Sequence, residues 1–225
     1  MQIQCIKGNI LNVKADAMVL PANKALREGS GVSTVMFQAA GRKNLTDACR
    51  KIGTCEEGNA VVTLAYDLDA DYIVHAVVPR WEDGKHGEYD RLCAAYLAAL
   101  KAADITGRET IAFPLLGSGN NGYNLELALE IAIKSIEEFQ PMNLKVAYLV
   151  IYGNRISDIV SGKGYSFTVV PNEYMKRKSE KPRNNAALEK GLGAVKDFFG
   201  NKENVDNILD TAVRIVKLVA LIKGL

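Results

Sequence analysis

Glycines at fixed spacing are the residues of this chain whose chemistry is easiest to name. Residues 111–124 read IAFPLLGSGNNGYN, in which Gly117, Gly119 and Gly122 spell G-x-G-x-x-G between an apolar run and a helix-like segment. A second glycine loop, REGSGVS at residues 27–33, also follows an apolar run. Glycine lets backbone N–H groups approach a phosphate closely, and the first turn of a following helix favours negative charge. Both loops therefore predict phosphate binding.

The later loop resembles the fingerprint of a dinucleotide-binding oxidoreductase. That fingerprint needs a strand, a glycine turn, a helix and a second strand that ends, about 20 residues on, in an acidic residue. Here the acidic residues Glu137 and Glu138 stand at a helix end, before the next strand begins. The loop also comes late in the strand and helix pattern. The sequence favours two glycine loops that grip one pyrophosphate from opposite sides.

The elements that must position these loops alternate along the chain. Apolar runs rich in Val, Ile and Tyr predict strands near residues 2–6, 17–20, 59–66, 72–78, 110–116 and 145–152. Helical spacing predicts helices near residues 32–53 (in two pieces), 89–103 and 125–139. Such alternation indicates an α/β fold with a mostly parallel sheet covered on both faces. Ligands in such folds bind beyond the carboxyl ends of the strands, where both glycine loops are expected.

The composition changes near residue 172. Residues 1–172 carry 17 Lys and Arg against 19 Asp and Glu, whereas residues 173–225 carry 11 against 7. We expect one domain over residues 1–172, a charged linker over 173–190 and a helical extension over 191–225. One face of its final helix collects Val205, Ile208, Leu209, Ala212, Val216 and Val219. That face is expected to pack on its own domain or on a second copy in a homodimer, with membrane-surface contact as the alternative; it is too short and too charged to span a bilayer.

Composition and residue spacing argue against several classes of protein and of site. The formal net charge of +2 gives no reason to invoke nucleic acid. The amino-terminal residues lack the apolar core of a signal peptide, and the four cysteines (Cys5, Cys49, Cys55 and Cys93) are irregularly spaced, so a reduced, cytoplasmic protein is expected. No C-x-x-C pair occurs, and the two histidines, His75 and His86, are far from a zinc pattern. We expect no metal and no cofactor.

Four motifs, taken in chain order, resemble the macrodomain family, an α/β module that binds ADP-ribose. They are QCIKGNI (4–10), MVLPANKALREGSGVSTVMFQAAG (18–41), GNAVVTLAYDLDADYIVHAVVPRW (58–81) and FPLLGSGNNGY (113–123). The resemblance covers about residues 1–170. It implies a three-layer α/β/α fold with a mixed, mostly parallel sheet, followed here by a C-terminal helical extension. It also implies free or protein-linked ADP-ribose as the partner.

The same resemblance assigns site residues. It places Asn9 and Ile10 at the adenine, Asn23 at the distal ribose, Gly29, Ser30, Gly31 and Val32 in the first phosphate loop, Ser118, Gly119, Asn120, Asn121, Gly122 and Tyr123 in the second, and Tyr152 as an adenine stacker. Asn9 replaces the family's aspartate, so adenine selectivity is expected to be looser, because a neutral acceptor makes a weaker bond than a charged one. Leu20 replaces an asparagine, and Asn121 stands where the family usually has an aromatic residue.

The residues for catalysis depart further from the family. In the branch with a Gly-Val-Asp first loop, which this sequence most resembles, the aspartate helps to activate water; Ser33 stands in its place. In a second branch a lysine and an aspartate are used, and here His86 and Asn121 stand at or near those positions. Neither pair is complete. The candidate catalytic residues are Asn23, Ser33 and His86, and His86 is the best candidate base. The alternative for His86 is that it is an exposed loop residue without a catalytic role. His75 is expected in the core.

Three functions stay open at this point. The first is ADP-ribose binding with little or no turnover. The second is hydrolysis, either of ADP-ribosyl esters on acidic side chains or of O-acetyl-ADP-ribose, with a water activated by the substrate's own diphosphate. The third is a sensor in which the C-terminal helix converts ligand binding into dimerisation or partner binding.

Overall fold

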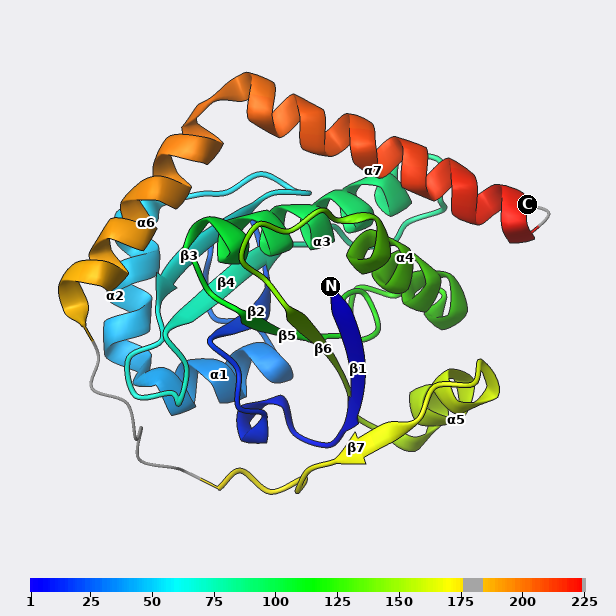
Figure 1. Ribbon diagram of the computed structural model, residues 1–225, viewed down its shortest axis with the longest axis horizontal. Helices are drawn as coiled ribbons and strands as arrows, with labels where there is room; N and C mark the ends of the chain where they lie inside the picture. The colour runs from blue at the N-terminus through cyan, green and yellow to red at the C-terminus, as the bar shows by residue number, and fades with distance from the viewer. Residues whose placement is uncertain (176–183, 224–225) are drawn as a thin grey trace.

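A seven-stranded sheet forms the centre of the molecule (Figure 1). The computed structural model describes residues 1–175 and 184–223. In chain order the strands are β1 (Gln2–Lys7), β2 (Ala17–Ala22), β3 (Ala60–Leu64), β4 (Tyr72–Val77), β5 (Thr110–Pro114), β6 (Val146–Ile151) and β7 (Phe167–Val169). Their order in the sheet is β3-β4-β2-β5-β6-β1-β7. The β3 strand is antiparallel to β4, and the other neighbouring pairs are parallel, which confirms the mixed, mostly parallel sheet.

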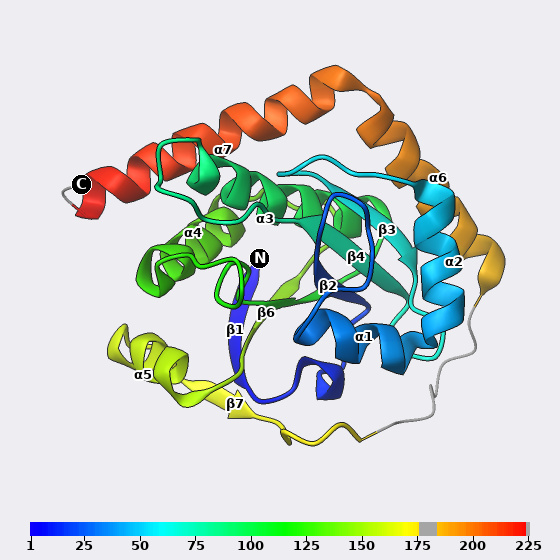
Figure 2. The same cartoon turned by 180° about the vertical axis from the view of Figure 1, so that it is seen from behind.

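Helices cover both faces of the sheet, as the sequence predicts (Figures 1 and 2). On one face lie the short 3-10 helix η1 (Ile10–Asn12), α1 (Val32–Ala40) and α2 (Arg42–Ile52). On the other face lie α3 (Glu88–Ile105), α4 (Leu125–Glu138) and α5 (Asn154–Gly162). Each layer of helices closes a separate apolar core against the sheet. The three-layer α/β/α arrangement is therefore confirmed.

The α3 helix is buried on almost every side. Its sequence is rich in alanine, and Ala94, Ala95, Ala98, Ala99 and Ala102 are all 2% exposed or less. A helix that is apolar all round must be covered on both faces. The sheet covers one face of α3, and the C-terminal extension covers the other. The small side chains let both layers approach it closely.

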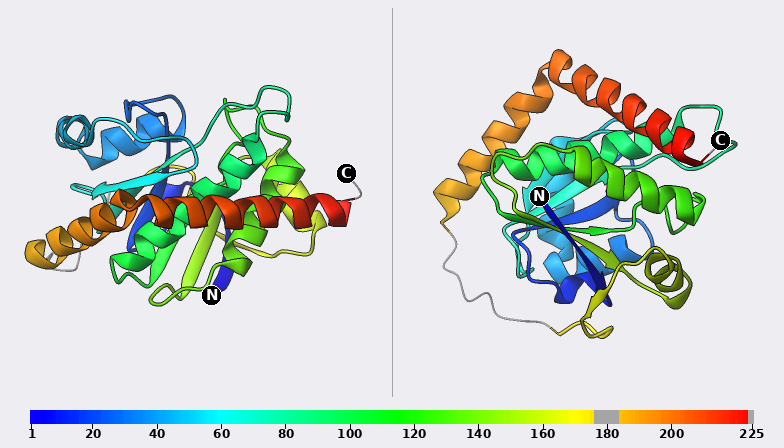
Figure 3. Two further views of the ribbon diagram at one scale, coloured as in Figure 1. Left: turned by 90° about the horizontal axis from the view of Figure 1, so that it is seen from above. Right: turned by 45° about the vertical axis from the view of Figure 1, so that its right-hand side comes forward.

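The extension consists of α6 (Asn185–Gly200) and α7 (Lys202–Lys223). Figures 1 and 3 show α6 beside the β3 edge and α7 laid along the outer side of α3 and α4. The Tyr72 hydroxyl donates to the Leu188 carbonyl at 2.9 Å, which joins α6 to the sheet. Six residues of the segment expected as a linker, 185–190, lie in α6, and residues 176–183 lie outside the described residues.

The buried face of α7 contains Ala212, Ile215 and Val219, each less than 5% exposed. It therefore packs on its own domain. The predicted face is wrong at one position, because Leu209 is 43% exposed; the buried stripe runs through Ile215 instead. No helix within the described ranges is both long and apolar enough to cross a membrane.

Three elements have no counterpart among the predicted ones, namely the short helix η1, helix α5 and the three-residue strand β7. The β7 strand adds to the β1 edge of the sheet and turns the chain back toward the start of η1. The Val170 N–H donates to the Lys7 carbonyl at 2.9 Å, and the Asn9 N–H donates to the Pro171 carbonyl at 3.3 Å. Gly8 permits this approach, because a Cβ there would lie 2.1 Å from the Val170 carbonyl oxygen.

Candidate ligand-binding site

The first glycine loop joins the carboxyl end of β2 to α1. Asn23 begins it, and its amide accepts from the Arg27 N–H at 3.1 Å and donates to the Arg27 carbonyl at 2.8 Å. Gly31 precedes the first helical residue with φ of 62°, a conformation that favours glycine. No side chain caps α1 at this residue. The first N–H groups of a helix have no acceptor within the helix, so the start of α1 offers donors to an anion.

Ser33 and Thr34 fix the loop from within. The Gly29 N–H donates to the Ser33 hydroxyl oxygen at 3.0 Å, and the Thr34 hydroxyl donates to the Gly29 carbonyl at 2.6 Å. Ser33 is only 3% exposed. Its hydroxyl therefore holds the loop in shape, and the structure gives it no carboxylate or histidine partner among the described residues.

The second glycine loop joins β5 to α4. Asn124 caps α4 by accepting from the Leu127 N–H at 3.0 Å, and the Ser118 hydroxyl donates to the Leu115 carbonyl at 2.7 Å. Gly117 has φ of 84°, and a Cβ there would lie 2.9 Å from the Tyr123 ring. Tyr123 is 4% exposed and donates to the Glu88 carbonyl at 3.1 Å. Tyr123 thus supports the loop from behind.

The two loops meet above the sheet. They follow β2 and β5, which are parallel neighbours, and the Asn120 amide donates to the Ser30 hydroxyl oxygen at 2.7 Å. At Gly31 and Gly119 an added Cβ would find no protein atom within 4 Å. Both glycines therefore face open space at the rim where the loops come together.

A third segment, residues 78–87 after β4, lies against the second loop. The Trp81 N–H donates to the Asn121 carbonyl at 2.7 Å, and the Asn121 amide lies 3.5 Å from the Val78 carbonyl oxygen. The Trp81 ring packs on Tyr89 and Tyr123, with ring centroids 4.7 and 5.7 Å away. The Asn121 side chain is thus directed at this segment.

Glu88 anchors that segment. Its carboxylate accepts from the backbone N–H groups of Glu82, Asp83, Gly84 and His86, at distances of 2.8 to 3.3 Å. Burial raises the pKa of Glu88, but bonds from backbone N–H groups outweigh it and hold the pKa at about 2. The residue is 1% exposed and ionised at neutral pH. Sequence analysis missed Glu88, because a glutamate at a helix start is typical of an ordinary helix.

The two histidines lie in contrasting surroundings. The His86 side chain is 61% exposed, and its Nε2 lies 3.6 Å from the Asp83 carboxylate. His75 is fully buried on β4, with Nε2 2.9 Å from the Thr63 hydroxyl, and burial lowers its pKa to about 4. His75 is therefore a core residue, as its apolar strand indicates.

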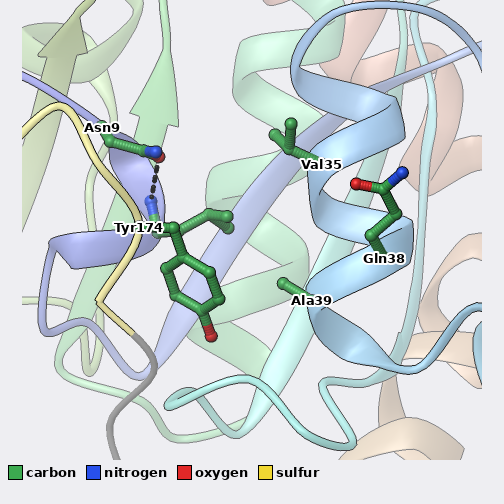
Figure 4. Close-up of a pocket in the computed structure, with 6 residues that line it drawn as sticks. Asn9, Val35, Gln38, Ala39 and Tyr174 are labelled. Atoms are coloured by element: carbon green, nitrogen blue, oxygen red, sulfur yellow. Dashed lines mark hydrogen bonds between the residues drawn. The ribbon is translucent and has the colours of Figure 1, made fainter.

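The base end of the predicted site lies where β1 and β6 end side by side. Asn9 caps η1, because its amide oxygen accepts from the Leu11 N–H at 3.0 Å, while its amide nitrogen donates to the Asn172 carbonyl at 3.0 Å. Ile10 is buried, and Tyr152, just beyond β6, is 67% exposed. Beside Asn9 is a pocket of about 290 Å³. It is lined by Asn9, Leu11, Val35, Gln38, Ala39 and Tyr174 (Figure 4).

Comparison with known proteins identifies the family. A sequence model of the Macro domain family matches residues 19–132. A macro domain-containing protein of Caldanaerobacter subterraneus subsp. tengcongensis is 36% identical over 164 residues, which are 71% of this chain and 94% of that protein. The chain belongs to the macrodomain family.

Two further macrodomain relatives carry names that bear on ligands. The O-acetyl-ADP-ribose deacetylase of Escherichia fergusonii is 39% identical over 142 residues, which are 61% of this chain and 80% of that protein. A solved structure of a Trypanosoma brucei macrodomain in complex with ADP-ribose is 26% identical, with a TM-score of 0.64 over 72% of this chain and 68% of that one. The family model, at residues 19–132, does not reach the extension formed by α6 and α7.

Three positions that depart from the family's sequence pattern, Asn9, Ser33 and Asn121, each make contacts of their own in this structure. Asn9 donates to a carbonyl, which an aspartate could not do. The Ser33 hydroxyl oxygen accepts from the Gly29 N–H, and the Asn121 side chain contacts the segment after β4. Tyr174, which lines the pocket beside Asn9, was missed by the sequence analysis, because the charged stretch after Pro171 indicates a linker.

Proposed function

We propose that this macrodomain binds ADP-ribose, free or linked to protein, with the diphosphate between the two glycine loops. The junction of the loops carries this proposal: Asn120 ties them together, and Gly31 and Gly119 leave open space beside the uncapped start of α1. Backbone N–H groups at such a junction provide donors without bringing in side-chain bulk. The Trypanosoma brucei relative, solved in complex with ADP-ribose, supports the choice of ligand.

The other parts of the ligand follow from this position. Asn23 begins the first loop and lies on the side of the distal ribose. Asn9 stands at the end of β1 beside the pocket where the adenine would lie; Ile10 and Tyr152, at the ends of β1 and β6, are not among the residues that line this pocket. We expect no metal or cofactor to take part, since backbone donors and neutral side chains are sufficient for binding.

Isothermal titration with ADP-ribose tests the proposal directly. Micromolar affinity is expected for the wild-type protein. Gly119→Leu is the sharpest variant, because a side chain there meets no protein atom within 4 Å and its φ is not in the left-handed region. The fold should therefore survive, while the side chain fills the phosphate path and weakens binding about 100-fold or more.

The matched control is Gly193→Leu. Gly193 lies in α6 and also has open space around its Cβ position. This variant should bind ADP-ribose like the wild type. No heat with the wild-type protein, or equal binding by Gly119→Leu and Gly193→Leu, would contradict the proposal.

Hydrolysis of an ADP-ribosyl ester is the second candidate, because the Escherichia fergusonii relative is named a deacetylase of O-acetyl-ADP-ribose. The Ser33 hydroxyl already accepts from the Gly29 N–H, and a serine hydroxyl is a poor general base at neutral pH. His86 is exposed; its ring lies near Asp83 of the same loop, and its backbone bonds Glu88 and Arg91 of α3. We therefore propose binding as the main function and slow turnover at most.

A carboxylate at position 33 tests whether binding, and not hydrolysis, is the main function. Ser33→Asp can still accept from the Gly29 N–H and adds a base beside the loop, so ADP-ribose release from aspartate- or glutamate-modified protein should rise about tenfold or more. Ser33→Asn is the control, since it has the same shape without the charge. An unchanged rate in Ser33→Asp would show that more than this one position separates binding from catalysis.

A further inference from the structure

The segment Val170–Met175, here called the strap, crosses the base end of the site. Its backbone is tied to Asn12, a 4% exposed residue of η1. The Asn12 amide nitrogen donates to the Pro171 and Glu173 carbonyls, both at 2.7 Å, and its oxygen accepts from the Met175 N–H at 3.0 Å. A buried amide with both ends in use fixes its partners firmly.

Asn9 fastens the same strap from the ligand side. Its amide nitrogen donates to the Asn172 carbonyl, while its oxygen faces the Leu11 N–H. The carbonyl oxygen of an amide has two lone pairs, so it can still accept from an exocyclic amino group. An aspartate at this position would lose the bond to Asn172 and place a charge beside that carbonyl. The asparagine therefore fits a protein that keeps the strap closed.

The strap brings Tyr174 to the pocket beside Asn9. Figure 4 shows the Tyr174 ring between η1, which Asn9 caps, and the side of α1 that carries Val35 and Ala39. The pocket is thus lined by an aromatic ring and by aliphatic side chains, together with Asn9 and Gln38. A flat heterocycle with polar edges matches this lining.

The distance between the first phosphate loop and the pocket also fits a nucleotide whose base lies in the pocket. Helix α1 rises about 1.5 Å per residue, so Val35 lies about 6 Å and Ala39 about 12 Å along the helix from Gly31. A diphosphate at Gly31 leaves room for one ribose before this pocket is reached. The pocket and the phosphate loop are therefore placed to hold one nucleoside diphosphate.

We propose that the strap is a specificity element of this macrodomain, in which Tyr174 forms one wall for a purine base and Asn12 is the positioning residue that holds it there. This inference rests on the proposed function. Wild-type protein should bind ADP more tightly than UDP, because the larger purine ring covers more of the Tyr174 ring than a pyrimidine does.

Titrations with ADP and UDP on four variants test it. Tyr174→Leu keeps an apolar side chain but removes the ring, and should weaken ADP binding about tenfold while UDP changes less than about threefold. Tyr174→Phe keeps the ring and should preserve the wild-type ratio of the two affinities. Asn12→Asp cannot donate to the strap carbonyls, and should lower that ratio as Tyr174→Leu does. Phe199→Leu removes a half-buried ring from α6 and should change neither affinity.

The outcomes separate the two proposals. An ADP-to-UDP ratio in Tyr174→Leu equal to that of the wild type would overturn the role of the strap, while binding of ADP-ribose would stand. Wild-type protein that binds neither ADP nor ADP-ribose would overturn the proposed function and, with it, this inference. A ratio that falls equally in Phe199→Leu would show a general loss of stability instead of a role in base selection.

Discussion

The two ends of the site are built in different ways. At the phosphate end each glycine loop is held from within by a local bond, since Ser33 bonds Gly29, four residues away, and Ser118 bonds Leu115, three residues away; only the junction of the loops, Asn120 to Ser30, spans 90 residues. At the base end, Asn9 bonds a carbonyl 163 residues further along the chain, and Asn12 bonds one 161 residues away. Each phosphate loop is therefore shaped by a short stretch of sequence, whereas the base end takes shape only when the chain after β7 has returned to η1.

This difference indicates which part of the site can vary most easily. Backbone donors in glycine loops recognise a diphosphate whatever nucleotide carries it. Side chains and a strap recognise the rest of the ligand, and they can change without disturbing the loops. The base end is thus where we expect this macrodomain to differ from its relatives.

The largest effect is expected from a methyl group at Gly8, which would break the base end alone. Gly8 has φ of 138°, and a Cβ would lie 2.1 Å from the Val170 carbonyl oxygen. Gly8→Ala should lower the free energy of unfolding by about 3 kcal/mol, from backbone strain and from displacement of the strap. Urea denaturation measures this loss.

Gly53→Ala is the matched control for Gly8→Ala. Gly53 also has a positive φ, 89°, but a Cβ there meets nothing within 4 Å. It should therefore show only the cost of the strain, about 1 kcal/mol. Equal losses in the two variants would mean that the strap is not packed against Gly8, and the contrast between the two ends would weaken.

The next largest effect is expected at low pH, where the phosphate end should lose stability before the base end does. The pKa of Glu88 is lowered from 4.5 to about 2 in the folded protein. Its contribution to stability is therefore fully present above about pH 4.5 and is lost as the pH falls toward 2. The strap is held by the amides of Asn9 and Asn12, which do not titrate. Fluorescence of Trp81, the single tryptophan, follows the segment that Glu88 holds.

Glu88→Gln examines the same anchor at neutral pH. An amide offers one acceptor oxygen where the carboxylate has two, and it turns an N–H₂ group toward backbone donors. We expect a shifted Trp81 emission and ADP-ribose binding about fivefold weaker, with the ADP-to-UDP ratio unchanged. Glu82→Gln, at an exposed position, is the control. A changed ratio would show that the two ends are coupled and not independent.

The contrast also explains what the sequence could predict. Glycine spacing and alternating periodicity are local signals, and they predicted both loops and strands β1 to β6. The strap could not be predicted, because Pro171 and the charged residues after it are typical of a linker, and nothing near Tyr174 indicates that its partners are Asn9 and Asn12. The β7 strand could not be predicted either, because it pairs along only three residues and is partly exposed, which leaves too few residues for a periodic pattern. Ser33, expected at the end of the first glycine loop, lies in the first turn of α1, and its bond to Gly29 depends on a turn geometry that the sequence does not specify.

The smallest effect is expected at the one side-chain bond between the loops. Asn120→Ala removes the 2.7 Å bond to Ser30, which is exposed, so ADP-ribose affinity should fall only about threefold with little change in melting temperature. Asn124→Ala, four residues further on, should behave in the opposite way. It removes the cap of α4 and should cost about 1 kcal/mol of stability with little change in affinity. Unchanged affinity in Asn120→Ala would mean that each loop is held by its own turn alone, and the phosphate end would then be still more local than its junction indicates.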